Sequence, residues 1–213
     1  MFRQQGLPPQ VGRWECPQLR TIVIAGFLGS GKTTVLLQLA KRLTDDGQRV
    51  AVVENEIGEV GIDGKYVAEH GLLVQELFGG CICCTLTIGL IDALEGLART
   101  FRPDYVLVEP TGIAQPAELA EAVRQYSTQS AHVSVITLLD AERYFMLSEV
   151  LGPLLEGQIS HADVVAVNKC DLVEPPELER IVTDVRALAP RTSLVTMSEG
   201  DRSALETVLG AVL

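Results

Sequence analysis

Residues 26–33 read GFLGSGKT, and this stretch decides the fold. It matches the P-loop pattern G-x-x-x-x-G-K-[ST], in which glycines let backbone N–H groups converge on phosphate oxygens. A short, β-branched apolar run at 21–25 precedes it, and a helical pattern follows from Lys32. The positive end of that helix dipole adds to the attraction for phosphate. The sequence therefore predicts a nucleotide phosphate site between the first strand and the first helix.

Each residue in the second half of this loop has an expected role. Lys32 should reach the β- and γ-phosphates and assist catalysis, and the Thr33 hydroxyl should ligate Mg²⁺. The predicted nucleotide-binding residues of the loop are Gly29, Ser30, Gly31, Lys32, Thr33 and Thr34. A glycine-rich turn without a ligand is the alternative, and the strand and helix that flank the loop speak against it.

Strand and helix patterns alternate along the rest of the chain. Short apolar runs predict strands at 21–25, 50–54, 105–109, 133–139, 164–168 and 193–196. Helical spacing predicts helices at 32–46, 86–97, 176–188 and 203–212. Because the strands are apolar on both faces, they should be parallel and covered on both sides. The predicted fold class is α/β, a three-layer P-loop NTPase domain with a mainly parallel sheet flanked by helices. We expect a flexible leader at 1–18 and a single P-loop GTPase domain at 19–213.

Composition and charge limit the possible partners. The chain has 213 residues, of which 47% are hydrophobic, as in a packed globular protein. Its formal net charge of −11 argues against nucleic acid or an anionic membrane surface as a partner. No apolar run approaches a membrane span, and the N-terminal stretch lacks the apolar region of a signal peptide. A cytoplasmic location is expected, where thiols stay reduced, so the five cysteines do not predict a disulfide framework.

The predicted strand at 164–168 ends in the pattern N-K-x-D, at residues 168–171. The Asp171 carboxylate can accept two hydrogen bonds from guanine, whereas adenine would present an acceptor there. The stem of Lys169 can lie along the base. Asn168, Lys169 and Asp171 are therefore predicted to bind the base and to favour GTP, although a solvated turn is the commoner origin of such a short pattern. Cys170 is expected to pack as an inert thiol.

A second strand end carries the sequence Glu-Pro-Thr-Gly, at 109–112. Glu109 can hold a Mg²⁺-bound water, and Gly112 lets its N–H approach the γ-phosphate without a Cβ in the way. Both are predicted catalytic residues of a segment that moves on hydrolysis. The alternative is a simple strand-end charge. We expect slow intrinsic hydrolysis, because Ile113 stands where a water-orienting glutamine could be and no arginine finger is evident.

Three thiols within four positions, Cys81, Cys83 and Cys84, precede the predicted helix at 86–97. They suit a soft metal such as Zn²⁺. Adjacent cysteines diverge on a helix, so a further ligand is needed, which predicts a labile site suited to passing a metal on. Buried thiols that pack as small hydrophobic groups are the alternative.

The acidic segment at 54–63, ENEIGEVGID, separates the phosphate motifs from the thiols. Asp63 can face Mg²⁺, and Glu54 or Glu59 can complete the thiol site, with His70 as a further candidate ligand. A solvated acidic loop explains any single one of these residues equally well.

Taken together, these motifs resemble the CobW family of metallochaperone P-loop GTPases. The resemblance rests on residues 26–34, 54–63, 79–84, 109–112 and 168–171. It implies GTP-driven delivery of Zn²⁺ or a related ion such as Co²⁺ to a client metalloprotein. Two departures are visible: members usually carry a further C-terminal domain, and this chain has Gln115 before Pro116 where the family often has aspartate.

Other functions stay open at this point. A P-loop kinase for a small acceptor would prefer ATP and would not need the thiols. A non-catalytic module would hold nucleotide and metal without turnover. A homodimer that shares the nucleotide face is compatible with the sequence, but no residue pattern establishes it.

Overall fold

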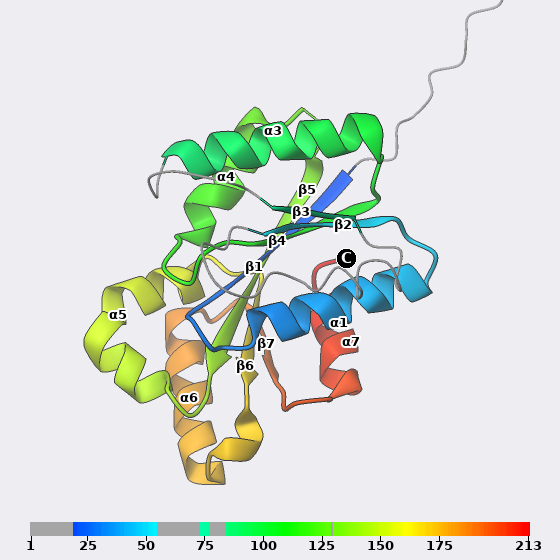
Figure 1. The fold of residues 1–213 in the computed structure, drawn as a ribbon. Coiled ribbons are helices and arrows are strands. Elements are labelled where there is room, and N and C mark those ends of the chain that lie inside the picture. The colour runs from blue at the N-terminus through cyan, green and yellow to red at the C-terminus, as the bar shows by residue number, and fades with distance from the viewer. Residues whose placement is uncertain (1–18, 55–72, 77–83, 129) are drawn as a thin grey trace, which may run out of the picture.

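The computed structural model describes residues 19–54, 73–76, 84–128 and 130–213 (Figure 1). Within them, seven parallel strands form one sheet in the order β3-β2-β4-β1-β5-β6-β7. The strands are β1 (Leu19–Gly26), β2 (Val50–Glu54), β3 (Leu73–Glu76), β4 (Tyr105–Glu109), β5 (Ser130–Asp140), β6 (Val164–Asn168) and β7 (Ser193–Thr196). The helices are α1 (Lys32–Asp45), α3 (Cys84–Thr100), α4 (Pro116–Tyr126), α5 (Tyr144–Ser160), α6 (Pro175–Leu188) and α7 (Arg202–Gly210), with a 3₁₀ turn η1 (Cys170–Leu172).

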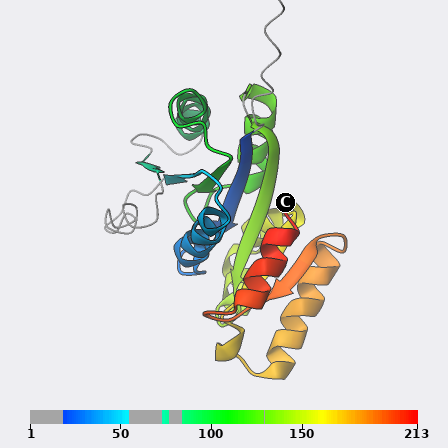
Figure 2. The same cartoon turned by 90° about the vertical axis from the view of Figure 1, so that its right-hand side faces the viewer.

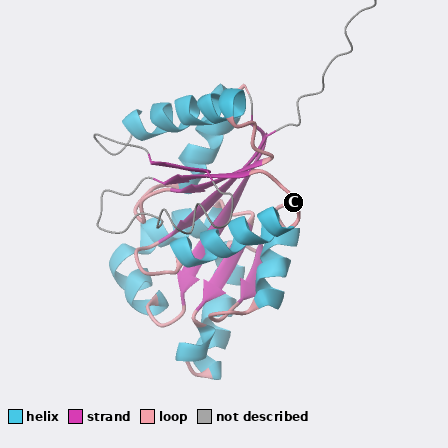
Figure 3. Ribbon diagram, turned by 45° about the vertical axis from the view of Figure 1, so that its right-hand side comes forward, coloured by secondary structure: helices cyan, strands magenta, loops and turns pink. Residues whose placement is uncertain are grey.

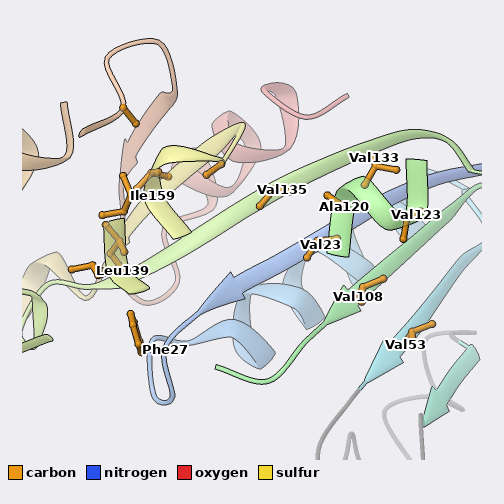
Figure 4. Packing of buried hydrophobic residues seen from close by; sticks show 14 of the residues in the cluster. Val23, Phe27, Val53, Val108, Ala120, Val123, Val133, Val135, Leu139 and Ile159 are labelled. Carbon is orange, nitrogen blue, oxygen red and sulfur yellow. The ribbon is translucent and has the colours of Figure 1, made fainter. Parts of the chain in front are cut away.

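The helices cover the sheet on both sides, which confirms the predicted three-layer α/β class (Figures 1 and 2). Alternate residues of each strand enter different cores: Val23 of β1 packs with α3–α6, whereas its neighbours Ile22 and Ile24 pack with α1 and α7. Figure 4 shows Val23, Val108 and Val53 on one side of the sheet, with Ala120 and Val123 of α4 near Val23 and Val108. Each central strand is apolar on both faces, and helices bury both faces. Continuous apolar runs are typical of parallel strands covered in this way, which is why the sequence predicted them.

All six predicted strands are present, and the described residues also form β3, α4, α5 and η1, which were not predicted. β3 has only four residues and lies at one edge of the sheet. α4 buries only Pro116, Ala120 and Val123, a weak apolar stripe. α5 has non-helical backbone at Leu151 and contains Pro153, and its exposed apolar side chains obscure the helical period.

Because the strands are parallel, their carboxyl ends all lie along the same side of the sheet, at the strand ends seen between the helices in Figure 3. In open α/β sheets this edge is where ligands bind. The P-loop follows β1 there, and the last residues of β2, β4, β5 and β6 lie there too: Glu54, Glu109, Asp140 and Asn168. Within the described ranges, the structure contains no helix with both the length and the apolar character needed to cross a bilayer.

Candidate functional site

The P-loop leads directly into α1, whose first residue is Lys32. The Lys32 side chain is 7% exposed, and its Nζ donates to the Phe27 carbonyl at 3.3 Å. The same Nζ lies 3.8 Å from Glu109 Oε1. Thr33 Oγ1 donates to that carboxylate oxygen at 3.1 Å. The structure thus brings together the three side chains expected to act on phosphate and Mg²⁺, and their hydroxyl and carboxylate oxygens are the donors that Mg²⁺ accepts.

A cavity of about 450 Å³ opens beside these residues. Lys32, Glu54, Glu109 and Arg143 are its charged lining residues, and apolar side chains of the P-loop and α5 supply much of the remaining wall. Glu54 is 5% exposed and pairs in register with Glu109 across β2 and β4. Glu109 is partly buried and lies near Lys32, and two carboxylates on adjacent strand ends favour further cations, so this cavity suits a metal ion and phosphate together.

The segment after β4 lies directly against the P-loop. A Cβ on Gly112 would come within 2.8 Å of the Leu28 backbone nitrogen and 3.2 Å of the Phe27 carbonyl carbon. This contact with the P-loop backbone gives residue 112 a requirement for glycine that the sequence reasoning had tied to the γ-phosphate alone.

Gln158 of α5 holds the same segment from the other side. Its side chain is fully buried, and Nε2 donates to the carbonyls of Gly112 and Ala114, both at 3.1 Å. The Gln158 carbonyl in turn accepts from Thr137 of β5 at 2.9 Å. Sequence reasoning missed Gln158, because a glutamine in an unrecognised helix belongs to no motif.

A second cavity of about 300 Å³ lies on the other side of the P-loop, between α1, η1 and the turn after β7. Its lining includes Thr34, Asn168, Lys169, Asp171 and residues 197–200. Asn168 Nδ2 donates to the Ser30 carbonyl at 2.9 Å, so the predicted base loop is bonded to the predicted phosphate loop. A Cβ on Gly31 would come within 2.5 Å of that amide nitrogen, and Gly31 has φ +95°, so both space and backbone require glycine there.

Lys169 takes a left-handed conformation, φ 61°, that turns the chain into η1. Its Nζ donates to Asp140 Oδ2 at 2.7 Å, and Asp140 is 2% exposed. The other Asp140 oxygen accepts from the Arg143 backbone N–H at 3.3 Å. Asp140, which the sequence did not single out, therefore joins the base side of the site to the turn that begins α5.

That turn places an arginine on the P-loop. Arg143 Nη1 donates to the Leu28 carbonyl at 2.9 Å, and a Cβ on Gly29 would lie 3.1 Å from the same nitrogen. No arginine finger is evident in the sequence, and the structure places Arg143 against the P-loop backbone. The physical reason is that Leu28 and Arg143 are 115 residues apart in the chain and meet only through the adjacent ends of β1 and β5.

The profile of CobW/HypB/UreG, nucleotide-binding domain, matches residues 20–196. The chain belongs to this family. It is 35% identical over 158 residues to the zinc chaperone YeiR of Escherichia coli, an alignment that covers 73% of this chain and 48% of that protein. It is 28% identical to the zinc chaperone CobW of Pseudomonas aeruginosa, covering 97% of this chain and 62% of the relative. The chain spans about half the length of the curated relatives it matches.

Solved structures of family members share the fold. The hydrogenase maturation factor HypB of Archaeoglobus fulgidus has a TM-score of 0.68 at 16% identity, over 92% of each chain. The Zn(II)-bound YjiA GTPase of E. coli has a TM-score of 0.68 at 23% identity, over 92% of this chain and 61% of that one. At this level of identity the likeness supports the α/β fold.

The predicted family metal site lies largely outside the described residues. Glu59, His70, Cys81 and Cys83 fall there, as does Asp63, the predicted Mg²⁺ ligand. Cys84 is the first residue of α3, and its side chain is not described. Of the predicted ligands for a transition metal, the structure describes the side chain of Glu54 alone. In the part of the chain that the structure describes, no three histidine, cysteine or acidic side chains form a group that could hold a metal.

Cys170 provides a test of the base loop. Burial raises the pKa of its thiol, the neighbouring Asp171 carboxylate adds to the rise, and Sγ donates to the Val167 carbonyl at 3.1 Å. We expect iodoacetamide to modify Cys170 several-fold more slowly at about pH 8 than a free cysteine, with the rate rising at higher pH as thiolate forms. Peptide mass mapping of native and urea-unfolded protein measures this, and equal rates in the two states would contradict the geometry.

Proposed function

We propose that this chain is the GTP-binding and GTP-hydrolysing part of a cytoplasmic metallochaperone, which couples nucleotide state to delivery of Zn²⁺ or a Co²⁺-like ion to a client metalloprotein. The observation that carries the proposal is the 2.9 Å bond from Asn168 to the Ser30 carbonyl, since it joins a base pocket lined by Asp171 to the P-loop. The relatives of this chain include zinc chaperones, which supports a metal ion as the cargo.

Magnesium belongs to this proposal as a cofactor. Thr33 and Glu109 would hold it, together with Asp63 from outside the described residues, and it would neutralise charge on the β- and γ-phosphates. Lys32, held near Glu109 at 3.8 Å, would turn toward the phosphates when nucleotide enters. The close approach of Gly112 to the P-loop and the hydrogen bond from Gln158 to the Gly112 carbonyl would then fix the position of the segment that senses the γ-phosphate.

Coupling between nucleotide and cargo follows from neighbouring strand ends. Glu109 is a predicted Mg²⁺ ligand, and Glu54, its partner in register, is with Glu59 one of the two carboxylates predicted to complete the cargo site. GTP would close the segments 54–63 and 109–115 and fix the thiol site, and hydrolysis would loosen both. Such coupling requires different metal affinities in the two nucleotide states, and metal must change GTP affinity by the same factor.

Intrinsic hydrolysis is expected to be slow. Ile113 follows Gly112, and its side chain is 55% exposed where a water-orienting glutamine would be needed. A P-loop kinase would instead show ATP preference, and a non-catalytic module would bind GTP without releasing phosphate.

Titrating Zn²⁺ into the protein loaded with GDP or with a non-hydrolysable GTP analogue tests the proposal. We expect Zn²⁺ affinities that differ by about 5- to 150-fold between the two states, the usual range of allosteric coupling. The matched control is Cys83→Ala, which should bind less metal while keeping GTP affinity. Identical Zn²⁺ dissociation constants in the two states would defeat the coupling, and a preference for ATP would favour the kinase.

A further inference from the structure

Arg143 lies at the start of α5 with its guanidinium against the P-loop. Nη1 donates to the Leu28 carbonyl at 2.9 Å, and a Cβ at Gly29 would be 3.1 Å from the same atom. This is the only hydrogen bond of the guanidinium among the described residues, although a guanidinium has five N–H donors. The group therefore retains donors for a further acceptor.

The cavity in front of the guanidinium supplies the setting for such an acceptor. Arg143 lines it with Lys32, and these are its two cationic residues in the described part of the chain. Glu54 and Glu109 are the anionic ones, and Leu28, Leu147 and Leu151 are apolar residues of the same lining. An anion bound in this cavity would lie beside both cations and would be attracted by each of them.

The backbone of Arg143 is fixed, unlike that of a mobile lid. Its N–H donates to the Asp140 carbonyl at 3.2 Å and to Asp140 Oδ1 at 3.3 Å. Asp140 is itself buried and paired with Lys169. The backbone of Arg143 is thus held by Asp140 at the end of the central strand β5, and no reorganisation is needed to bring its side chain to the P-loop.

We propose that Arg143 is a catalytic residue of GTP hydrolysis, supplied by the chain itself, which stabilises the charge that develops on the phosphates in the transition state. The proposal rests on the proposed GTPase function. In the reaction, the oxygen of water bonds to the γ-phosphorus, and the bond from that phosphorus to the β–γ bridging oxygen breaks with its electron pair left on GDP. The water proton passes to the released phosphate. Arg143 donates hydrogen bonds to the oxygens that gain charge, and it transfers no proton.

Alanine and lysine variants at this position separate a role in catalysis from support of the P-loop. For Arg143→Ala we expect the single-turnover rate of bound GTP·Mg²⁺ to fall by about 100-fold or more, with GDP affinity within about threefold of wild type. Arg143→Lys keeps a donor for the Leu28 carbonyl but lacks the planar fork, so it should bind GDP normally and remain slow. Arg180→Ala is the matched control, because it removes an equal charge that stacks on Phe145 in the neighbouring α6–α5 contact.

Binding of GDP with aluminium fluoride, a mimic of the transferring phosphoryl group, gives a second readout. We expect Arg143→Ala to weaken this complex as strongly as the hydrolysis rate, while GDP alone binds as in wild type. Wild-type hydrolysis rates in Arg143→Ala, or parallel losses of GDP affinity and rate that Arg143→Lys restores, would overturn the proposal and leave Arg143 as a support of the P-loop. Absence of GTP turnover in the wild-type protein would instead overturn the proposed function itself.

Discussion

Replacing Gly112 with alanine is expected to lower the rate of GTP hydrolysis by about 100-fold and to destabilise the fold by roughly 1–3 kcal/mol. The new Cβ would stand 2.8 Å from the Leu28 nitrogen and 3.2 Å from the Phe27 carbonyl carbon, so two backbone segments would have to separate. Neither can yield easily, because Gln158 holds the Gly112 carbonyl at 3.1 Å and Arg143 holds that of Leu28 at 2.9 Å. The displaced segment would no longer place its N–H at the γ-phosphate.

Gly96→Ala is the matched control for that experiment. Gly96 lies within α3, and a Cβ there would meet nothing within 4 Å, so alanine should stabilise the helix by about 0.5–1 kcal/mol. Phosphate release and urea unfolding, measured on both variants, test the prediction. Wild-type hydrolysis and stability in Gly112→Ala would mean that the P-loop and this segment are not packed as closely as the distances indicate.

The fold was predictable because its elements follow local rules. The strand at 50–54 and the helix that begins at Lys32 appear where continuous apolar runs and helical spacing placed them. β3 and α5 escaped prediction for physical reasons: the first is a four-residue edge strand, and the second contains Pro153 and non-helical backbone at Leu151. In both elements the local hydrophobic pattern is weak, and contacts with the rest of the sheet and its helices stabilise them.

The candidate site was predictable only where a motif carries the chemistry. Lys32, Thr33 and Glu109 come from two such motifs, and the structure places Lys32 within ion-pair distance and Thr33 within hydrogen-bond distance of Glu109. Gln158 and Arg143 belong to no motif, because each acts on a segment that is distant in the sequence and adjacent in the fold. Predicting these two residues would require the order of the strands in the sheet, because that order decides which strand ends are neighbours. The strand order is set by tertiary packing and not by local sequence.

Replacing Asp171 with asparagine is expected to weaken GDP and GTP binding by about 100-fold or more, since each hydrogen bond to a charged group contributes about 1.5–3 kcal/mol. Asp171 lies in η1, lines the base cavity and is exposed to solvent, so the substitution should leave folding stability within about 0.5 kcal/mol. Asp184→Asn, an equally exposed change on α6, controls for the loss of one negative charge.

The same variant should gain affinity for xanthine nucleotides, and this reversal separates recognition of the base from general damage. A carboxylate presents two acceptors to the N1–H and amino group of guanine, whereas an asparagine amide presents one acceptor and one donor. Xanthine carries a carbonyl in place of that amino group, so the amide donor finds an acceptor and the pairing is restored. Fluorescence titration with GDP and xanthosine diphosphate measures both affinities. Unchanged GDP binding in Asp171→Asn would show that another group reads the base, and the preference for GTP would then lose its physical basis, because Asn168 is already engaged by the Ser30 carbonyl and Lys169 by Asp140.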